Sequence, residues 1–246
     1  MAIPSPLPAK DIAALPAALP AAVVRETLDD AGQTVVRASF VGELPHGPMQ
    51  VFSAPGKPAF DASYQAGLPH GPMRLFDERG QLLQETQRIG GLAEGVTRSY
   101  YPSGKLMQTV QHVRGVQHGE AVSYAESGDV TARLPYAAGR LEGEATYFHE
   151  GRMLRRERYR AGLLDGEAID YAPGGGVAQS STYAANVLHG PLRRYWPNGQ
   201  LMEEVAYRQG KPHGIARRFD QAGREVVEAA APQGFMKSLE KFVRGA

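Results

Sequence analysis

The twenty residues 195–214, YWPNGQLMEEVAYRQGKPHG, contain two turn signals that flank one alternating segment. Residues 197–199, Pro-Asn-Gly, favour a turn because proline fixes a negative φ and glycine accepts a positive one. In residues 201–207, Leu, Val and Tyr recur at even spacing, which is the two-residue period of a strand. Gly210 ends this strand, and residues 215–219 are expected to form a second, short strand. The stretch therefore predicts a β-hairpin.

The same pattern recurs along the chain with a period of 24 residues, shortened once to 23. Two columns of glycine follow this period, and each member of the second column comes fifteen residues after a member of the first. Such regularity identifies a repeat protein. The first column is Gly32, Gly56, Gly80, Gly104, Gly128, Gly151, Gly175, Gly199 and Gly223, and the second is Gly47, Gly71, Gly95, Gly119, Gly143, Gly166, Gly190 and Gly214.

Aromatic residues and a third column follow the same period. An aromatic residue lies five positions after each second-column glycine, and another lies seven positions before six of these glycines. The third column holds glycine or, once, Asn186, and asparagine is the other residue that readily adopts a positive φ. The chain should therefore form about eight hairpins and half of a ninth. The later aromatics are Phe52, Phe76, Tyr100, Tyr124, Phe148, Tyr171, Tyr195 and Phe219, the earlier ones are Phe40, Tyr64, Tyr136, Tyr159, Tyr183 and Tyr207, and the third-column glycines are Gly67, Gly91, Gly115, Gly139, Gly162 and Gly210.

Residues 195–219 carry the elements Tyr-x-x-x-Gly-x-Leu, Tyr-x-x-Gly-x-x-His-Gly and a closing aromatic. This pattern resembles the MORN repeat, in the bacterial variant carried by YwqK-family antitoxins, and the resemblance covers roughly residues 28–226. The resemblance implies an all-β fold, an elongated antiparallel sheet of about eight stacked 24-residue hairpins. It also implies that the sheet binds other molecules and has no catalytic residues.

Three features depart from the pattern of this family. Acidic residues, Glu94, Glu142 and Asp165, replace the histidine before the second-column glycine in three repeats. Gly42 comes one place early in the first unit. The turn at residues 148–151 is one residue short, which produces the single 23-residue interval.

The two ends of the chain differ from the repeats. Residues 1–26 are a Pro/Ala-rich arm with a composition that suits an extended chain, whereas the repeat domain is expected over residues 27–226. In residues 227–246, apolar residues spaced i, i+1, i+4, i+7 and i+8 from Phe235 predict a short amphipathic helix. We expect this helix to cap the last hairpin, with docking of a partner as the alternative. Prolines and charges make the arm a poor secretion signal, so we expect a cytoplasmic protein.

The composition excludes several classes of protein. The chain has 246 residues, with 27 Lys and Arg against 26 Asp and Glu, and a formal net charge of +1. So small a charge provides no long-range attraction for nucleic acid, and no nucleic-acid partner is expected. The chain has no cysteine, which excludes disulfides, a thiol nucleophile and Cys-ligated zinc.

A row of histidines is the one feature of the sequence that suggests a metal site, but its spacing argues against one. Equivalent positions in neighbouring hairpins lie about 9.6 Å apart, which is too far for two ligands of one zinc ion, so we expect a role in turn structure. Residues 173–176, Pro-Gly-Gly-Gly, lack the basic residue of a phosphate-binding loop, and no catalytic motif is present. We therefore expect no catalytic residue, no metal and no cofactor. Five of the seven histidines directly precede a second-column glycine: His46, His70, His118, His189 and His213.

The short strand after each second-column glycine carries charged residues on the face of its aromatic residue. Arginine occupies the third position after the glycine four times, and glutamate occupies the first position three times. Because arginine beside aromatic rings is favoured at binding surfaces, these residues are candidates for contact with a partner. The alternative is that the arginines only cover the aromatic ladder and keep it solvated. The candidates are Arg74, Arg98, Arg193, Arg217, Glu120, Glu144 and Glu167.

Together these features predict a non-enzymatic binding protein. By resemblance, the most specific hypothesis is an immunity protein (antitoxin) that occludes a cognate bacterial toxin or effector through protein–protein contact. One alternative is a lipid- or membrane-associated scaffold that uses the arginine and aromatic face against anionic lipid, and another is a secretion adaptor. Inhibitors of nucleases commonly mimic acidic nucleic acid, and a chain with a net charge of +1 does not, so a target other than a nuclease is favoured.

Overall fold

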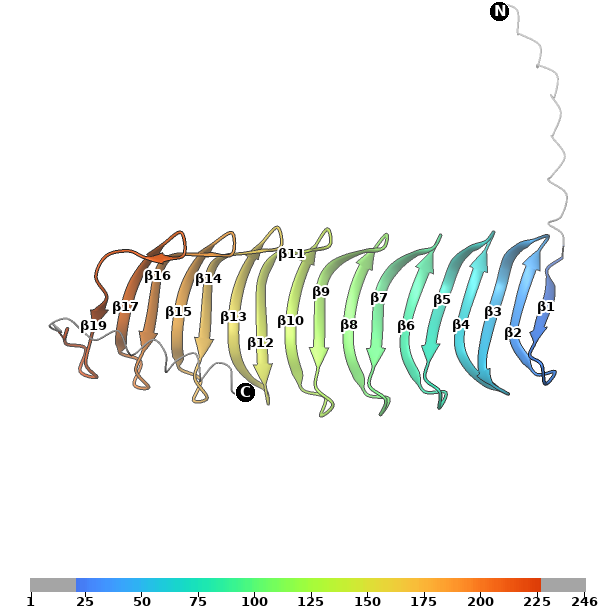
Figure 1. Cartoon of the computed structure of the whole chain (residues 1–246), viewed down its shortest axis with the longest axis horizontal. Coiled ribbons are helices and arrows are strands. Elements are labelled where there is room, and N and C mark those ends of the chain that lie inside the picture. Colours follow the sequence, from blue (N-terminus) through green and yellow to red (C-terminus); the bar gives the residue numbers. More distant parts are fainter. Residues whose placement is uncertain (1–20, 227–246) are drawn as a thin grey trace, which may run out of the picture. The chain divides into compact units, whose positions relative to one another are not determined.

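The computed structural model describes residues 21–226, and its regular elements are antiparallel β-strands (Figure 1). The chain divides into two compact units, of which the first ends at Leu92 and the second begins at Ala93. The predicted all-β, antiparallel hairpin fold is thus confirmed for the described residues. The strands are β1 (Val23–Leu28), β2 (Thr34–Val41), β3 (Leu44–Ala54), β4 (Lys57–Gln65), β5 (Leu68–Phe76), β6 (Leu82–Ile89), β7 (Leu92–Tyr100), β8 (Leu106–Val113), β9 (Val116–Tyr124), β10 (Val130–Ala137), β11 (Arg140–Leu141), β12 (Gly143–His149), β13 (Arg152–Arg160), β14 (Leu163–Tyr171), β15 (Val177–Ala184), β16 (Val187–Tyr195), β17 (Leu201–Arg208), β18 (Lys211–Pro212) and β19 (Arg217–Arg218).

In the first unit, each strand from β1 to β6 pairs antiparallel with the next strand along the chain. In the second unit the same order continues from β7 to β17, except that β10 pairs with both β11 and β12. Strand order therefore follows chain order within each unit, as stacked hairpins require.

The last predicted strand is shorter than expected. Of residues 215–219, only Arg217 and Arg218 form β19, which pairs with β17, and Ile215 is 91% exposed. Beyond β19, the described residues add only an isolated bridge between Phe219 and Glu225. Strands at the equivalent place in earlier repeats pair with a neighbour on each side. Because no complete hairpin follows β19 among the described residues, β19 pairs only with β17.

One end of most hairpins is a two-residue turn in which both residues have positive φ, as a type I′ turn requires. Between β13 and β14 these residues are Ala161 at 51° and Gly162 at 85°, and between β15 and β16 they are Ala185 at 48° and Asn186 at 68°. The third sequence column is therefore selected for its dihedral angle, as predicted. Gly42 comes early because only the first residue of its turn has positive φ, at 63°, which is the pattern of a type II′ turn.

The other end of most hairpins is a wider turn that a first-column glycine closes. The N–H of Gly80 donates to the carbonyl of Asp77 at 2.9 Å, and the N–H of Asp77 donates to the carbonyl of Gln81 at 2.9 Å. With Gly80 at φ 81°, this is a type I turn followed by a glycine bulge. The repeat that is one residue short closes instead with Glu150 and Gly151 alone, both at positive φ.

The second glycine column, apart from Gly214, lies within strands, where the backbone also has positive φ. Gly190 has a φ of 117°, and a Cβ atom built on it would lie 3.0 Å from the Cβ of Thr182. Across the ladder, Gly190 lies opposite Tyr207, and Gly166 lies opposite Tyr183. Glycine thus meets the dihedral requirement and leaves room for the side chain of the preceding strand, here Thr182.

The buried side chains of the sheet are small. Six of the nine buried apolar residues among those described are alanines, and no large side chain is fully buried. An open antiparallel layer exposes both of its faces, so larger side chains remain partly exposed on either side. The alanines are Ala38, Ala62, Ala93, Ala121, Ala145 and Ala168.

The two predicted end segments lie largely outside the described residues. The cap helix predicted for residues 227–246 lies entirely outside them, as do residues 1–20 of the predicted arm. Val23 to Glu26, which we expected to belong to the arm, instead begin β1 and pair with β2. The β-structure thus begins four residues before the predicted start of the repeat domain, because β1 completes the first hairpin.

Candidate functional site

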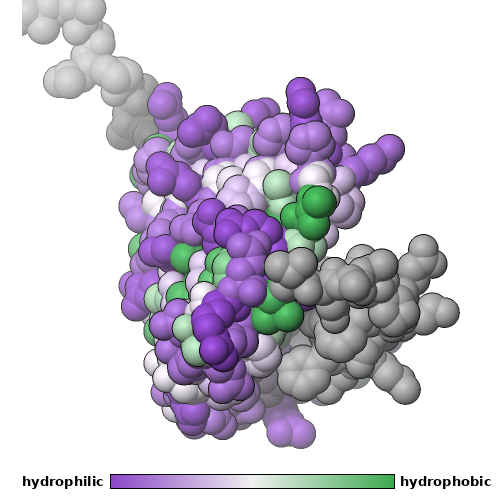
Figure 2. Space-filling model, turned by 90° about the vertical axis from the view of Figure 1, so that its left-hand side faces the viewer, coloured by the Kyte–Doolittle hydropathy of each residue, from purple (hydrophilic) through white to green (hydrophobic). Residues whose placement is uncertain are grey.

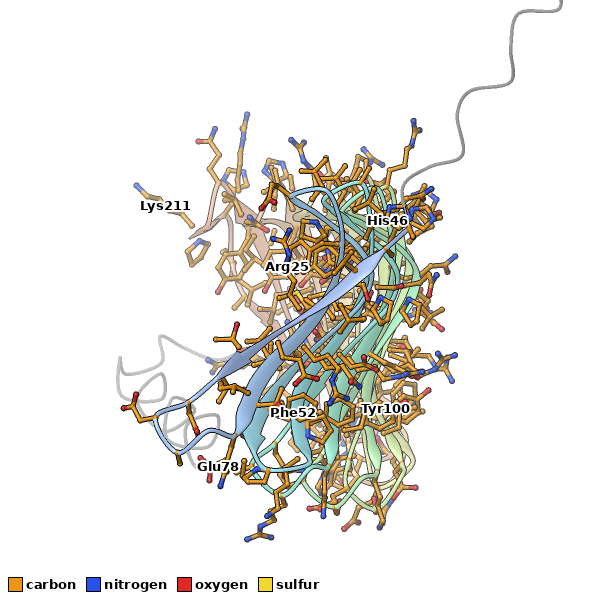
Figure 3. The ribbon with its side chains drawn as sticks, turned by 90° about the vertical axis from the view of Figure 1, so that its right-hand side faces the viewer. Arg25, His46, Phe52, Glu78, Tyr100 and Lys211 are labelled. Atoms are coloured by element: carbon orange, nitrogen blue, oxygen red, sulfur yellow. The ribbon has the colours of Figure 1, made fainter. Side chains whose placement is uncertain are left out.

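Side chains alternate between two faces of each unit, and the strand registers assign residues to these faces. Figure 3 looks onto the β1 edge of the first unit, with His46 at the end of the tight turns and Glu78 at the end of the wide turns. We call one face of this unit the arginine face, and it holds Arg37, Gln50, Asp61, Arg74 and Glu85 in successive strands. The opposite face is called the alanine face, and it holds Ala38, Met49, Ala62, Met73 and Thr86.

The second unit has the same two faces. All seven predicted contact residues lie on an arginine face, Arg74 in the first unit and the other six in the second. In the second unit this face holds Arg98, Thr109, Val122, Arg133, Thr146, Arg156, Ile169, Ser180, Arg193, Glu204 and Arg217. Its alanine face holds Thr97, Val110, Ala121, Ala145, Glu157, Ala168, Ser181, Leu192 and Val205.

Three of the predicted arginines form ion pairs with the residue opposite them in the ladder, and one of these pairs joins Arg217 to Glu204 at 3.9 Å. In the first unit, Arg74 Nη1 lies 3.5 Å from a carboxylate oxygen of Asp61. In the second unit, Arg193 Nε donates to Glu204 Oε2 at 2.6 Å. These arginines already have acidic partners within the chain, so a binding protein would have to replace or share those pairs.

Arg217 has both an acidic partner and an aromatic one. Its guanidinium group donates two hydrogen bonds to Glu225, at 2.9 and 3.1 Å, and lies 5.1 Å from the ring centroid of Phe219. Contact with the ring is the arrangement that the alternative interpretation of the arginines predicts.

The fourth predicted arginine, Arg98, lies on β7 opposite Thr109. Figure 2, which views the molecule from the β19 end, shows a mostly hydrophilic surface with smaller hydrophobic areas.

The three predicted glutamates pair with arginines that are not among the predicted contact residues. Glu120 accepts a hydrogen bond from Arg133 at 2.9 Å. Glu144 and Glu167, on alternate strands, lie 3.6 and 3.8 Å from the guanidinium group of Arg156 between them. A signal was available, because the two-residue period of the longer strand of each repeat places Arg133 and Arg156 on this face.

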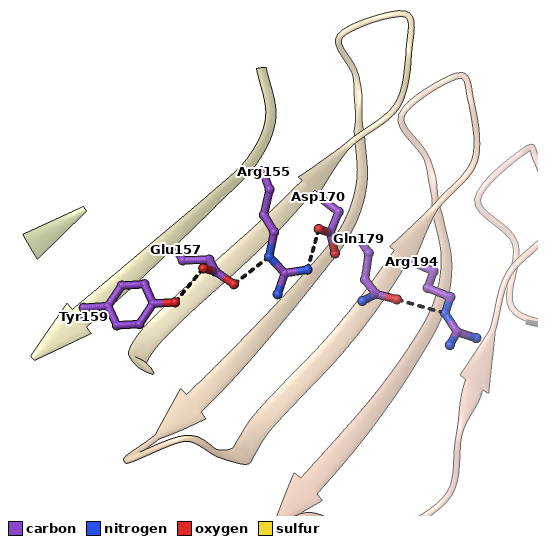
Figure 4. Close-up of polar contacts among 6 residues, drawn as sticks. All are labelled: Arg155, Glu157, Tyr159, Asp170, Gln179 and Arg194. Atoms are coloured by element: carbon purple, nitrogen blue, oxygen red, sulfur yellow. Dashed lines mark hydrogen bonds and ion pairs between the residues drawn. The ribbon is translucent and has the colours of Figure 1, made fainter. Parts of the chain in front are cut away.

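A polar network lies on the alanine face of the second unit (Figure 4). Tyr159 donates to Glu157 Oε2 at 2.8 Å, and Arg155 Nε donates to the other oxygen of the same carboxylate at 2.6 Å. Arg155 Nη1 also donates to Asp170 at 2.9 Å. The side chain of Glu157 is only 10% exposed, although the equivalent positions of other repeats hold alanine, valine, leucine, serine or threonine. The fold therefore does not require a carboxylate at this position, and Glu157 is specific to its repeat.

The network has a counterpart on the strands that follow. Arg194 Nε donates to Gln179 Oε1 at 3.2 Å, and its Nη1 donates to Glu203 Oε2 at 2.9 Å. Arg218 Nε donates to the other oxygen of Glu203 at 3.3 Å. Gln179 lies opposite Asp170 in the ladder, so the two parts of the network adjoin (Figure 4). Across the two parts of the network, three arginines, Arg155, Arg194 and Arg218, balance three carboxylates, Glu157, Asp170 and Glu203.

Burial and neighbouring charges perturb three groups of the network. Burial raises the pKa of Tyr159 far above its usual value, and its hydrogen bond to Glu157 raises it further. Burial also raises the pKa of Asp170, although Arg155 opposes part of this effect. Burial by itself would lower the pKa of Arg155, but attraction to Asp170 and Glu157 outweighs it and raises the value. Tyr159 therefore stays neutral and Arg155 stays charged at neutral pH, which suits a structural role.

The column before the second glycine supplies hydrogen-bond acceptors to the tight turns. Glu94 accepts from the N–H of Arg114 at 2.8 Å, and Glu142 accepts from a turn N–H of the next repeat at 2.7 Å. In the first unit, His46 Nδ1 accepts from the N–H of Ala66 at 3.4 Å. Histidine and acidic residues exchange here because each offers an acceptor. The predicted role in turn structure is confirmed for His46, and Glu94 and Glu142 take the same role in their repeats.

Residues 21–226 contain no group of three or more His, Asp or Glu side chains placed to hold a metal ion. Over the same residues, no helix has the length and apolar character needed to cross a membrane.

Comparison with known families finds the MORN repeat variant in two segments, residues 93–113 and 188–209. The first segment spans β7 and β8, and the second spans β16 and β17, so each match covers one hairpin connected by a tight turn. No curated protein matches the chain. The chain therefore carries MORN repeat variants, and such repeats suggest a binding or scaffold role.

Proposed function

We propose that the chain is a non-enzymatic binding protein of the bacterial cytoplasm that acts as an immunity protein against a cognate toxin or effector. Its surface would cover the active site of the toxin or hold it in an inactive conformation. The observation that supports this proposal most is the open layer itself. In each unit, strand after strand presents side chains on two faces that are only partly buried, which provides a large contact area on a regular support.

Hydrogen bonds between successive repeats support an occlusion mechanism because they hold the surface in one conformation. At the tight turns, the N–H of Gly115 donates to the carbonyl of Ala93 at 2.7 Å. At the wide turns, the hydroxyl of Tyr101 donates to the carbonyl of Tyr124 at 2.7 Å. A preformed surface loses little conformational entropy on binding, so more of the contact energy appears as affinity.

The arginine face is the proposed contact surface for charged groups of the partner. Its ion pairs are partly exposed, with Arg193 at 40% and Glu204 at 25% side-chain exposure. Exposed pairs contribute little to folding, so a partner can exchange them without unfolding the sheet.

The product of the reading frame adjacent to the gene provides the direct test, because a toxin and its immunity protein must be inherited together. This product should be toxic when expressed alone and harmless when co-expressed with the chain. The purified proteins should form a complex with a Kd of about 1–10 nM. Alanine substitution of Arg74, Arg98, Arg193 and Arg217 should weaken that complex.

Three results would contradict the proposal. The first is an adjacent product that is harmless or that does not bind the chain. The second is binding to anionic liposomes that falls with salt and is lost in the fourfold alanine variant, which would favour the lipid scaffold instead. Turnover of an ester, phosphodiester or glycoside by the purified chain, abolished by one substitution, would overturn its non-enzymatic character.

A further inference from the structure

An apolar strip crosses the alanine face of the first unit. Val36 lies opposite Val51, Val51 opposite Phe60, and Phe60 opposite Leu75, so four apolar side chains adjoin across β2 to β5. The equivalent row in the second unit is polar for most of its length and includes Gln108, Ser123, Arg155, Asp170, Gln179, Arg194 and Glu203. The fold therefore does not require apolar residues in this row, and the strip is a property of the first unit alone.

The strip is exposed and extends into neighbouring rows. Leu75 is 40% exposed, and Val36, Val51 and Phe60 are only partly buried. In the first unit the extensive contacts between strands are those of neighbours in the sheet, so none of the strands within residues 21–226 lies over this face. Contiguous apolar surface that remains exposed marks an interaction site. Met49 and Met73 adjoin the strip in the next row, and methionine adapts readily to the shape of a partner.

Arg88 adds an unpaired charge to this face. Arg88 occupies the position equivalent to that of Tyr64 in the preceding repeat. It lies opposite Gly71, in the row of side chains next to that of Met73. Its Nε atom is buried and has no acceptor, and its Nη1 donates only to the carbonyl of Gly91, at 3.2 Å. Among the described residues, no carboxylate forms an ion pair with this guanidinium group. A cation beside apolar surface is stabilised by an anionic partner.

We propose that the apolar strip and Arg88 form a docking site for a segment of a partner protein that presents apolar side chains together with an aspartate or glutamate. The apolar side chains pack on the strip and its methionines, and the carboxylate pairs with Arg88. This inference rests on the proposed protein-binding function. It adds a second contact surface, on the alanine face of the first unit, and names the chemistry that a partner has to match there.

Charge distinguishes this occupant from two others. Strands β2 to β6 present no aspartate or glutamate on the alanine face, so a second copy of the chain packed face to face would leave both Arg88 charges unpaired. A membrane surface is held by several cations acting together, whereas β2 to β6 present only Arg88 on this face. A partner segment with apolar side chains and its own carboxylate can cover the strip and also pair with Arg88.

The experiment is a selection of displayed random peptides of about 16 residues on the purified full chain, followed by affinity measurements with the enriched peptides. Enriched peptides should combine apolar residues with Asp or Glu. Their affinity should fall at least about tenfold on Leu75→Ser and again on Arg88→Gln. Leu68→Ser is the matched control, because Leu68 lies on the same strand at 54% exposure but on the opposite face. Arg79→Gln, in the exposed turn after β5, is the control for Arg88→Gln. Both controls should leave the affinity unchanged.

Several results would overturn the docking site. These are an empty selection, enriched peptides without acidic residues, peptides whose affinity is the same for Leu75→Ser and Leu68→Ser, and a dimer of the chain that Leu75→Ser converts to monomer. Binding of neutral phosphatidylcholine vesicles that Leu75→Ser abolishes would assign the strip to lipid instead. If the adjacent toxin binds but its affinity is unaffected by Leu75→Ser and Arg88→Gln, the docking site is wrong while the proposed function stands. If that product does not bind at all and the peptides behave as expected, the docking site stands without the immunity function.

Discussion

Single residues with positive φ determine how each hairpin closes. Gly162 at 85° and Asn186 at 68° occupy equivalent places in neighbouring tight turns, and the residue before each also has positive φ. At these larger φ values glycine is free of steric strain and asparagine is the common substitute, which is why the column tolerates one exchange. The preceding residues, Ala161 at 51° and Ala185 at 48°, lie at the edge of the small left-handed region that other residues can enter. The same argument does not apply to Gly174, whose φ is not positive and which has open space around it.

Substitution of Gly162 tests the dihedral requirement. Gly162→Val should lower the free energy of unfolding by more than about 1 kcal/mol, because a β-branched residue is strained at positive φ. Gly162→Asn should cost distinctly less. Chemical denaturation of the two variants checks the difference, with Gly174→Val as the control that should remain close to wild type. Equal unfolding midpoints for the valine and asparagine variants at position 162 would refute the requirement.

At the scale of elements, the edge strand β1 is held to its sheet by two ion pairs as well as by its ladder. Arg25 forms two hydrogen bonds to Glu43, at 2.9 and 3.0 Å, and lies 4.7 Å from the ring centroid of Phe40. On the other face, Arg37 donates to Glu26 at 2.7 Å. Hydrogen bonding from Arg25, supported by its charge, lowers the pKa of Glu43 below its usual 4.5, and Arg37 acts in the same way on the pKa of Glu26.

These lowered pKa values predict that β1 loosens in acid. A carboxylate with a lower pKa in the folded state contributes stability above its unfolded pKa of 4.5 and loses it as the pH falls through the folded value. Hydrogen exchange of the β1 amides bonded to β2, corrected for intrinsic rates, should therefore quicken below pH 4.5. Combined Glu26→Gln and Glu43→Gln substitution should remove this pH dependence. If the pH dependence of hydrogen exchange in β1 is unchanged in the double variant, other groups control the stability of this edge strand.

At the scale of the whole molecule, each strand contacts mainly its neighbours in the sheet. The large contacts join strands that are adjacent in the ladder, such as β3 with β4 and β14 with β15. Stability in such a protein is close to a sum over repeats and the interfaces between neighbouring repeats. A local defect should therefore remain local, and the buried carboxylate of Glu157 is the place to introduce one.

Glu157→Ala should open β12 to β15 while leaving β2 to β5 protected. Removing this carboxylate takes away the acceptor of the Tyr159 hydroxyl bond and leaves Arg155 paired with Asp170, at a local cost of about 2 kcal/mol or more. Glu144→Ala, in the same hairpin but with 55% side-chain exposure, is the control and should have little effect. Hydrogen exchange resolved by strand measures both variants. Equal loss of protection in β2 to β5 and in β12 to β15 would mean that the chain unfolds as one cooperative unit.

The amino-acid sequence by itself determined the repeat, its hairpins, the two kinds of turn and the division of each strand into two faces. These features depend on local chemistry: glycine and asparagine for positive φ, proline for the turns, and a two-residue period for the strands. The role of the His46 column in turn structure was predictable for a related reason, since zinc ligands have to converge on one point and this column does not.

Only the tertiary structure decided which charges meet. Arg156 lies between Glu144 and Glu167, and Glu157 joins Arg155 to Tyr159, because the pairing register of the strands brings these side chains together. In the ladder between β13 and β14, for example, the register shifts between Glu157 and Tyr159. A shift of one residue moves a side chain to the other face of the sheet, and the positions of such shifts depend on pairing between strands that are distant in the sequence.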